Sequence, residues 1–146
     1  MGQQPSKPEY EDIEFEIVNE GWNEYELEDG TKIRMRSVII EVQKRVGSEK
    51  DYRVKTHDIV VVIPALGLVG PPSDVELPAQ EYLKMKKQII RVVGDPKEPW
   101  SQYSLPDGHS FKLRMILSNV YRIEGQYDKE GRQRYVTLST TLVTPI

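Results

Sequence analysis

The sequence predicts an all-β protein made of two tandem, pseudo-symmetric copies of about four strands each, which share a small barrel or sandwich core. Three observations lead to this prediction. A segment that begins at Trp22 returns 78 positions later at Trp100, apolar and polar residues alternate over long stretches, and each copy has an Asp-Gly pair between two such stretches. A repeated segment of this kind indicates a duplication, and alternation with period two indicates half-buried strands.

The repeat aligns residues 22–47 with residues 100–125 without gaps and gives eight identities in 26 positions. Average residue usage would give about two. The identical pairs are Trp22/Trp100, Tyr25/Tyr103, Leu27/Leu105, Asp29/Asp107, Gly30/Gly108, Arg36/Arg114, Val42/Val120 and Gly47/Gly125. The match resumes at Tyr52/Tyr135 after a longer loop in the second copy. We therefore expect a flexible tail at residues 1–8, copy one at 9–70, a Pro-rich connector at 71–81 and copy two at 82–146.

Each copy begins with an alternating segment. Ile13, Phe15 and Ile17 alternate with glutamates and predict one half-buried strand, whose counterpart is residues 89–93. The first strand is acidic and the second is flanked by bases, so we expect the two to lie near each other.

The Asp-Gly pairs are the most specific local signal. Tyr25 and Leu27 predict a short strand, and Asp29-Gly30 follows directly. Asp107-Gly108 takes the same place in copy two. We interpret both pairs as hairpin turns rather than catalytic carboxylates, because glycine accepts the positive φ that a tight hairpin requires.

A long strand follows each turn. In residues 31–46, Ile33, Met35 and Ile39 share one face, whereas Val38, Ile40 and Val42 share the other. A strand that changes its buried face is usually bulged or bent. Copy two repeats the pattern.

The return strands are expected at residues 52–63 and 135–143, both rich in Val, Ile and Thr. The connector that follows the first is rich in proline. Residues 79–87, after Pro78, are the single predicted helix. The apolar run Val60 to Val69 is either a buried strand exit or an exposed docking loop, and we favour burial.

Bulk properties exclude several classes. The chain has 146 residues and no cysteine, so it has neither a disulfide framework nor a thiolate metal site. No apolar stretch reaches membrane-spanning length, and the first residues do not resemble a signal peptide. We expect a cytoplasmic protein.

Charge is divided unequally. Residues 1–81 have nine bases and 17 acids, a net charge of −8, whereas residues 82–146 have 11 bases and six acids, a net charge of +5. The difference indicates either electrostatic attraction between or within chains, or neutral drift on solvated surfaces.

Candidate interaction residues are aromatic or basic. Trp22 and Trp100 are either core anchors, which we favour, or exposed stacking platforms. A basic face would comprise Lys32, Arg34 and Arg36, their counterparts Lys112 and Arg114, and the further bases Lys84, Lys86, Lys87 and Arg91. Such residues follow a phosphate backbone in nucleic-acid-binding proteins, although charged residues are also normal on the solvent face of a sheet.

Catalytic and metal-binding signals are weak. His57 and His109 occupy non-equivalent positions with no acidic cluster at ligand spacing. Asp128 to Gly131 lacks the later oxygen ligands of a calcium loop and predicts a hairpin turn instead. We expect no enzymatic activity, no cofactor and no metal.

The unit Tyr25-x-Leu27-x-Asp29-Gly30, followed by a basic-then-aliphatic strand and a return strand at Tyr52, resembles a group of short, mainly archaeal proteins of unassigned function. Several of these resemble a single copy of the unit. Copy two departs from the pattern at Pro106 and His109, which flank its turn. The resemblance implies no activity, and the composition favours a thermophilic source.

The leading functional prediction is a non-enzymatic interaction or assembly module that self-associates by strand addition. If the strands do not close a barrel, we expect the return strand at 52–63 or the one at 135–143 to lie at an edge that accepts such a strand. The alternative is a nucleic-acid-binding small β-barrel that uses the basic face of copy two.

Overall fold

The computed structural model describes residues 9–145, which form ten strands and one short helix. The elements are β1 (Tyr10–Ile13), β2 (Glu16–Asn19), β3 (Asn23–Leu27), β4 (Lys32–Arg45), β5 (Tyr52–Ile63), α1 (Ala79–Leu83), β6 (Lys87–Ile89), β7 (Val92–Lys97), β8 (Ser101–Ser104), β9 (Ser110–Tyr127) and β10 (Gln133–Pro145). The all-β class is confirmed. The tail predicted at residues 1–8 lies outside the described residues.

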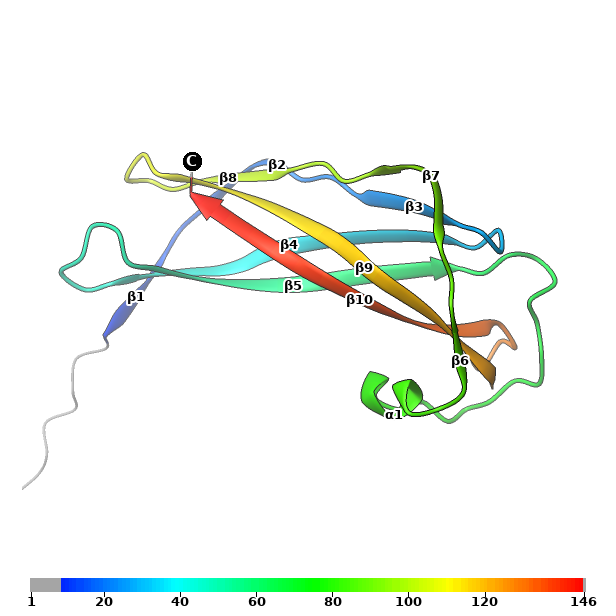
Figure 1. Cartoon of the computed structure of the whole chain (residues 1–146). Helices are drawn as coiled ribbons and strands as arrows, with labels where there is room; N and C mark the ends of the chain where they lie inside the picture. The colour runs from blue at the N-terminus through cyan, green and yellow to red at the C-terminus, as the bar shows by residue number, and fades with distance from the viewer. Residues whose placement is uncertain (1–8, 146) are drawn as a thin grey trace, which may run out of the picture.

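The strands form two five-stranded antiparallel sheets (Figure 1). In sheet A, β5 pairs along one side of β4, β3 and β1 pair with the two ends of its other side, and β7 pairs with β3. In sheet B, β10 pairs along β9, β8 and β6 pair with the two ends of its other side, and β2 pairs with β8. The prediction allowed a barrel or a sandwich. Neither sheet closes on itself within residues 9–145, so a closed barrel is not formed.

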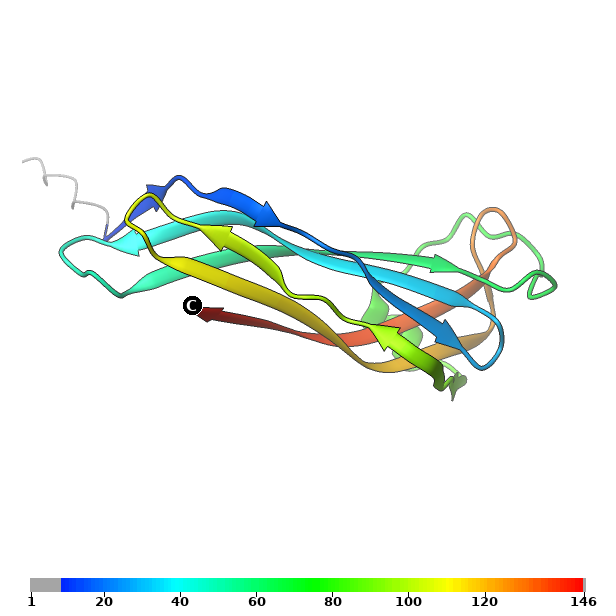
Figure 2. The ribbon, with the colours of Figure 1, turned by 90° about the horizontal axis from the view of Figure 1, so that it is seen from above.

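Each sheet contains a strand from the other half of the chain. We call residues 9–65 the N-terminal half and residues 68–145 the C-terminal half. β2 belongs to the N-terminal half but completes sheet B, whereas β7 belongs to the C-terminal half but completes sheet A. Figure 2 shows both halves extended along one long axis.

The inner faces of the sheets share the core. One buried cluster combines Leu27, Ile33 and Met35 of sheet A with Met115 and Val120 of sheet B. A second combines Ile39 and Val42 of sheet A with Tyr103, Phe111 and Leu113 of sheet B. Burial of this apolar surface, at roughly 25 cal/mol per Å², holds the sheets together.

The long strands change their buried face at irregular positions, as predicted. The β4–β5 register shifts between Ile39 and Glu41, so that Ile39 and Val42 both face the core. Ile40 lies at the shift and is 50% exposed, so its predicted burial beside Val42 is wrong. The β9–β10 register shifts between Leu138 and Ser139. An extra residue in one strand reverses the inward parity beyond it.

Three predicted elements are wrong in their extent. The alternating segment at residues 13–18 is two strands that enter different sheets, and Ile17 is 58% exposed. The segment at residues 89–93 is divided in the same way. The helix ends at Leu83 rather than at residue 87, because Lys87 begins β6. Alternation defines a face but not a partner sheet, which is why these breaks were not predicted.

The expected proximity of the two first strands is also wrong. β1 pairs with the last part of β4, and β6 pairs with the last third of β9. Because β4 and β9 run in opposite directions, β1 and β6 lie at opposite ends of the molecule (Figures 1 and 2).

Candidate interaction site

The long return strands lie at the edges of the sheets. Within residues 9–145, β5 pairs with β4 alone and β10 pairs with β9 alone. One side of each strand therefore presents backbone N–H and C=O groups that no neighbouring strand satisfies. Such an edge is a template for another extended chain.

Neither edge has the usual protection along its full length. Natural edge strands generally carry charges, prolines or bulges that discourage pairing. The first part of β5 has Arg53, Lys55 and Asp58, but residues 59–63 are five consecutive aliphatic residues. β10 has no charged residue after Arg134, and its one protection there before the terminal Pro145 is the register shift at Leu138. Val61, Ile63 and Leu142 are 39%, 47% and 40% exposed.

The two edges diverge from a single polar contact. Asp58 Oδ1 on β5 accepts hydrogen bonds from Ser37 Oγ at 2.6 Å and from Thr141 Oγ1 of β10 at 3.4 Å. On either side of this contact the gap between the edges is an open groove. One groove is about 340 Å³ and the other is about 330 Å³. Their lining side chains are mostly apolar: Tyr52, Val54, Phe111 and Val143 in the first, and Val60, Val62, Leu77, Tyr82 and Tyr135 in the second.

The two tryptophans lie outside the core. Asn23 and Tyr25 are buried, so by alternation Trp22 faces outward, where Arg34 and Arg36 lie 4.6 Å and 5.2 Å from its ring centre. Trp100 lies in the same way against Lys112 at 4.5 Å and Arg114 at 5.6 Å. The favoured interpretation of these rings as core anchors is wrong. Both rings are half-buried, and cation–π contacts near the protein surface contribute about 0.5–1 kcal/mol each.

A glutamate beside each tryptophan connects the two halves. Glu20 Oε1 accepts a hydrogen bond of 2.5 Å from Tyr103 Oη, and Glu98 Oε2 accepts one of 2.8 Å from Tyr25 Oη. Glu20 also pairs with Arg36, and Glu98 with Arg114. Burial, followed by the bond to Glu98, raises the pKa of Tyr25 to about 12, and the pKa of Tyr103 is raised for the same reasons.

Both Asp-Gly pairs lie in tight turns, and their aspartates accept hydrogen bonds from the opposite half. Gly30 has a φ of 86° and Gly108 a φ of 90°, the left-handed conformation that glycine allows. Asp29 Oδ2 accepts a 2.6 Å hydrogen bond from Tyr135 Oη and a 3.2 Å bond from Arg122. Burial opposes ionisation of Asp29, but the bonds from Tyr135 and Thr31 outweigh it and lower its pKa.

Asp107 has corresponding partners. It accepts a hydrogen bond from Tyr52 and lies 3.8 Å from Lys44 Nζ and 3.1 Å from His109 Nδ1. The bond from Tyr52 is the main cause of its lowered pKa.

This cluster brings one predicted histidine beside a carboxylate and a tyrosine, but its chemistry is limited. Burial and the bond to Asp107 raise the pKa of Tyr52 to about 12, so the phenol stays protonated at neutral pH. In the other turn Thr31 replaces His109, so the arrangement does not require an imidazole. His57 is exposed on β5 and far along the strand from this cluster. No group of three or more metal-ligating side chains occurs within the described residues.

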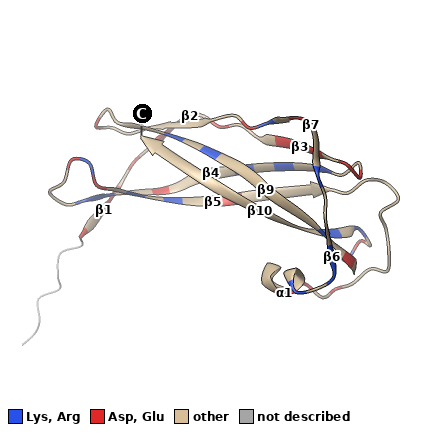
Figure 3. Ribbon diagram, in the orientation of Figure 1, with Lys and Arg blue, Asp and Glu red and all other residues tan. Residues whose placement is uncertain are grey.

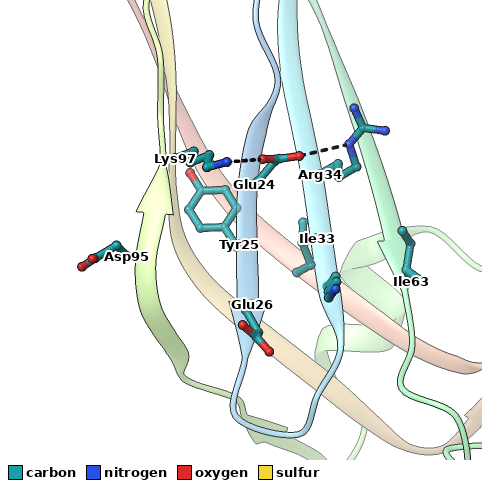
Figure 4. Close-up of a pocket in the computed structure, with 9 residues that line it drawn as sticks. Glu24, Tyr25, Glu26, Ile33, Arg34, Ile63, Asp95 and Lys97 are labelled. Carbon is teal, nitrogen blue, oxygen red and sulfur yellow. Dashed lines mark ion pairs between the residues drawn. The ribbon is translucent and has the colours of Figure 1, made fainter.

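A mixed-charge groove of about 360 Å³ lies over β3, β4 and β7 (Figure 4). Glu24 joins its two sides, because its carboxylate is 3.9 Å from Arg34 Nε and 3.4 Å from Lys97 Nζ. Three acids and three bases line the groove, so its lining has no net charge.

The predicted basic residues do not form one face (Figure 3). Lys112 lies near the start of β9, whereas β6 pairs with Tyr121–Ile123 of the same strand, roughly 30 Å further along at 3.3 Å per residue. Most of these bases are engaged within the chain. Lys84 pairs with Glu81, Lys86 pairs with Glu124, and Lys87 donates to the carbonyl of Leu83. The arginines at 34, 36 and 114 also pair with glutamates. Lys32 lines the groove over β3 and β4.

The apolar run after β5 is not buried as expected. Leu66 is fully exposed and Val69 is 67% exposed, whereas Leu68 is half-buried. The run forms an exposed turn at the end of the molecule.

Sequence reasoning missed the cross-half contacts. Glu20 and Glu98 are related by the same 78-residue shift, and extending the alignment two residues upstream would have paired them. The ungapped alignment also pairs Lys44 with Arg122, but nothing in the pattern indicates that each reaches the opposite turn.

Comparison with known proteins found no match among family models, curated proteins or solved structures. The one described helix, α1, is too short to cross a membrane.

Proposed function

We propose that this protein is a non-enzymatic assembly module that self-associates by pairing of its exposed edge strands. The observation that carries the proposal is the presence of two long edges, β5 and β10, with uncharged aliphatic stretches. Strand addition satisfies the free backbone groups of both partners and covers the exposed side chains. Cross-strand pairs contribute roughly 0.2–1 kcal/mol each, so several together support association.

We also propose that the chain is a structural duplication with two pseudo-symmetric copies. The support is that corresponding residues make corresponding contacts. Leu27 N donates to the Thr31 carbonyl at 2.8 Å, and Leu105 N donates to the His109 carbonyl at the same distance. The Tyr–Glu and Asp–Tyr contacts occur once in each direction between the halves, and the Trp–cation contacts occur once within each half.

The unequal charge of the two halves gives little support for head-to-tail attraction between chains. Some of these charges already pair within the chain, where Glu24 pairs with Lys97 and Asp29 pairs with Arg122. Nucleic-acid binding has less support than self-association, because the basic residues are dispersed and mostly paired within the chain.

Light scattering after size exclusion, over a range of protein concentration, tests the proposal. We expect mass to rise with concentration, and Val61→Lys on β5 to reduce association about tenfold, which corresponds to 1.4 kcal/mol. Ile40→Lys is the matched control, because Ile40 is an exposed aliphatic residue on the interior strand β4. A single-chain mass at every concentration and salt level would refute self-association.

A further inference from the structure

The contacts between the halves are extensive and specific. β2 pairs with β8 through Glu16↔Ser104 and Ile17↔Tyr103, and β7 pairs with β3 through Glu26↔Val93 and Leu27↔Val92. Four tyrosines donate hydrogen bonds to carboxylates of the opposite half. The two core clusters also contain side chains from both halves.

The segments that cross between the sheets also touch each other. Gly21 follows β2, and Pro99 precedes β8. A Cβ on Gly21 would lie 2.8 Å from Pro99 Cγ, and Asn19 Nδ2 donates to the Trp100 carbonyl at 2.9 Å. Each half therefore folds around the other rather than beside it.

The chain that joins the halves makes few contacts at one point. On one side, Ala65 N donates to Thr31 Oγ1 of the N-terminal half at 3.2 Å. On the other side, the Leu68 carbonyl accepts from Gln133 N at 3.1 Å, and Gly70 N donates to the Gly131 carbonyl at 2.9 Å, both in the C-terminal half. Between them, Leu66 is fully exposed, and the Leu68 N to Ala65 carbonyl bond of 3.2 Å closes the turn.

Gly67 makes this turn possible. Its φ is 101°, which residues with a side chain rarely adopt, and no atom lies within 4 Å of the position a Cβ would take. Opening the turn would release one weak backbone bond and would leave the remaining contacts of residues 65 and 68–73 with their own halves.

We propose that two copies of this chain exchange halves at the Ala65–Leu68 turn. The N-terminal half of each copy then packs with the C-terminal half of the other, so that every contact between halves forms twice. Because those contacts are the same in the single chain and in the exchanged dimer, the balance depends on the turn and on the entropy of association. The inference rests on the proposed function only in taking a second copy as the partner, since it uses the surface between the halves and not the edges of β5 and β10.

A disulfide placed across β2 and β8 tests the exchange. The natural chain has no cysteine, so Glu16→Cys with Ser104→Cys creates a single pair. These residues are direct neighbours in the ladder, where Cα atoms are roughly 4.5–5.5 Å apart, a separation that a disulfide spans. The dimer fraction is oxidised and run on a denaturing, non-reducing gel.

Exchange predicts a covalent dimer that thiol reduction returns to single chains. A dimer fraction that gives only single chains with an internal disulfide would overturn exchange and leave edge pairing standing. The matched control is Glu24→Cys with Arg34→Cys, a neighbouring pair on β3 and β4 within one half. It gives an internal disulfide in either case.

A second variant makes the test independent of the natural dimer population. Deletion of Leu66 and Gly67 leaves too little chain to form the turn, so we expect a shift from single chains to dimers with an unchanged β-sheet circular dichroism spectrum. Insertion of two glycines after Gly67 keeps the turn and should leave the wild-type distribution. A folded, single-chain deletion variant would overturn the proposal.

Discussion

The outer faces of the two sheets differ in polarity at one end of each long hairpin, β4–β5 in sheet A and β9–β10 in sheet B. In sheet B, Tyr121 and Val136 pair across β9 and β10, and Tyr82 of α1 covers Val136 together with the fully buried Ile123. In sheet A, the aligned positions are Gln43 and Arg53, which pair in the same register across β4 and β5, and Arg45.

Within residues 9–145 no helix covers the second site. Arg53 lies 3.7 Å from the ring of Tyr10, Arg45 pairs with Glu9 and Asp51, and Gln43 donates to Asp12. The same backbone pairing thus carries apolar side chains where the connector supplies a cover and polar side chains where it does not. The two sheets therefore share the same strand register, whereas their outer side chains are apolar only where another element packs over them.

Removing the side chain by which α1 covers sheet B should have the largest effect on the free energy of unfolding. Tyr82 is 6% exposed and packs on Ile123 and Val136. We expect Tyr82→Ala to lower the free energy of unfolding by about 3 kcal/mol, as is usual for a buried aromatic residue. Tyr10→Ala at the uncovered end should lose about 1 kcal/mol or less. Urea unfolding measures both, and equal losses would break the comparison.

The carboxylates of the two turns should differ less in their contributions to the free energy of unfolding. The side chain of Asp29, at the covered end, is 10% exposed, whereas that of Asp107 is 31% exposed. We expect Asp29→Asn to lose about 2 kcal/mol and Asp107→Asn about 1 kcal/mol, because a charged hydrogen bond is stronger where water is excluded. The same unfolding experiment applies, and a larger loss for Asp107→Asn would contradict the ranking.

Stability should decline at both extremes of pH. The pKa of each turn aspartate is lowered in the folded protein, so its contribution is present above the ordinary value of about 3.9 and is lost as pH falls below it. The pKa of Tyr135 and that of Tyr52 are raised to about 12, so their contribution is present below about 10 and is lost as pH rises towards 12.

Thermal unfolding followed by circular dichroism from pH 3 to pH 12 should show this plateau. In Tyr135→Phe the alkaline decline should weaken by about 1 kcal/mol. An unchanged alkaline limb would show that the bond from Tyr135 to Asp29 does not contribute.

Making the uncovered end apolar should change stability least. Arg45→Ile with Arg53→Val copies the aligned residues of sheet B, and exposed substitutions usually change the free energy of unfolding by no more than about 0.5 kcal/mol. The new apolar surface has no cover, so we expect its effect in association, seen as greater scattered mass at high concentration. A large loss of stability would mean that the Arg45 ion pairs are structural.

Local features of the fold were predictable because they depend on neighbouring residues. The bounds of β5 match the prediction, both Asp-Gly pairs lie in turns, and the change of face in β4 occurs where the pattern changes. The sheet that β2 joins was not predictable, because alternation specifies which side of a strand is buried and not which strand it meets. The position of Trp22 was available from the alternation of Tyr25 and Leu27, but the repeat suggested a core role instead.

The candidate site was predicted only conditionally. The return strands were expected at edges if the barrel did not close, and that condition depends on how far the sheets diverge around Asp58, a property of the whole assembly. The cross-half bonds of Glu20 and Asp29 arise from residues about 80 to 110 positions apart. No local pattern contains such contacts.

The interleaving of β2 and β7 also sets the order in which the chain can finish folding. During synthesis the N-terminal half emerges first, but sheet A lacks β7, and β2 has no partner until β8 is made. Neither sheet is complete until most of the chain has left the ribosome. Pairings so distant in sequence slow folding, and the unpaired edges of the nascent half stay open to other chains in the meantime.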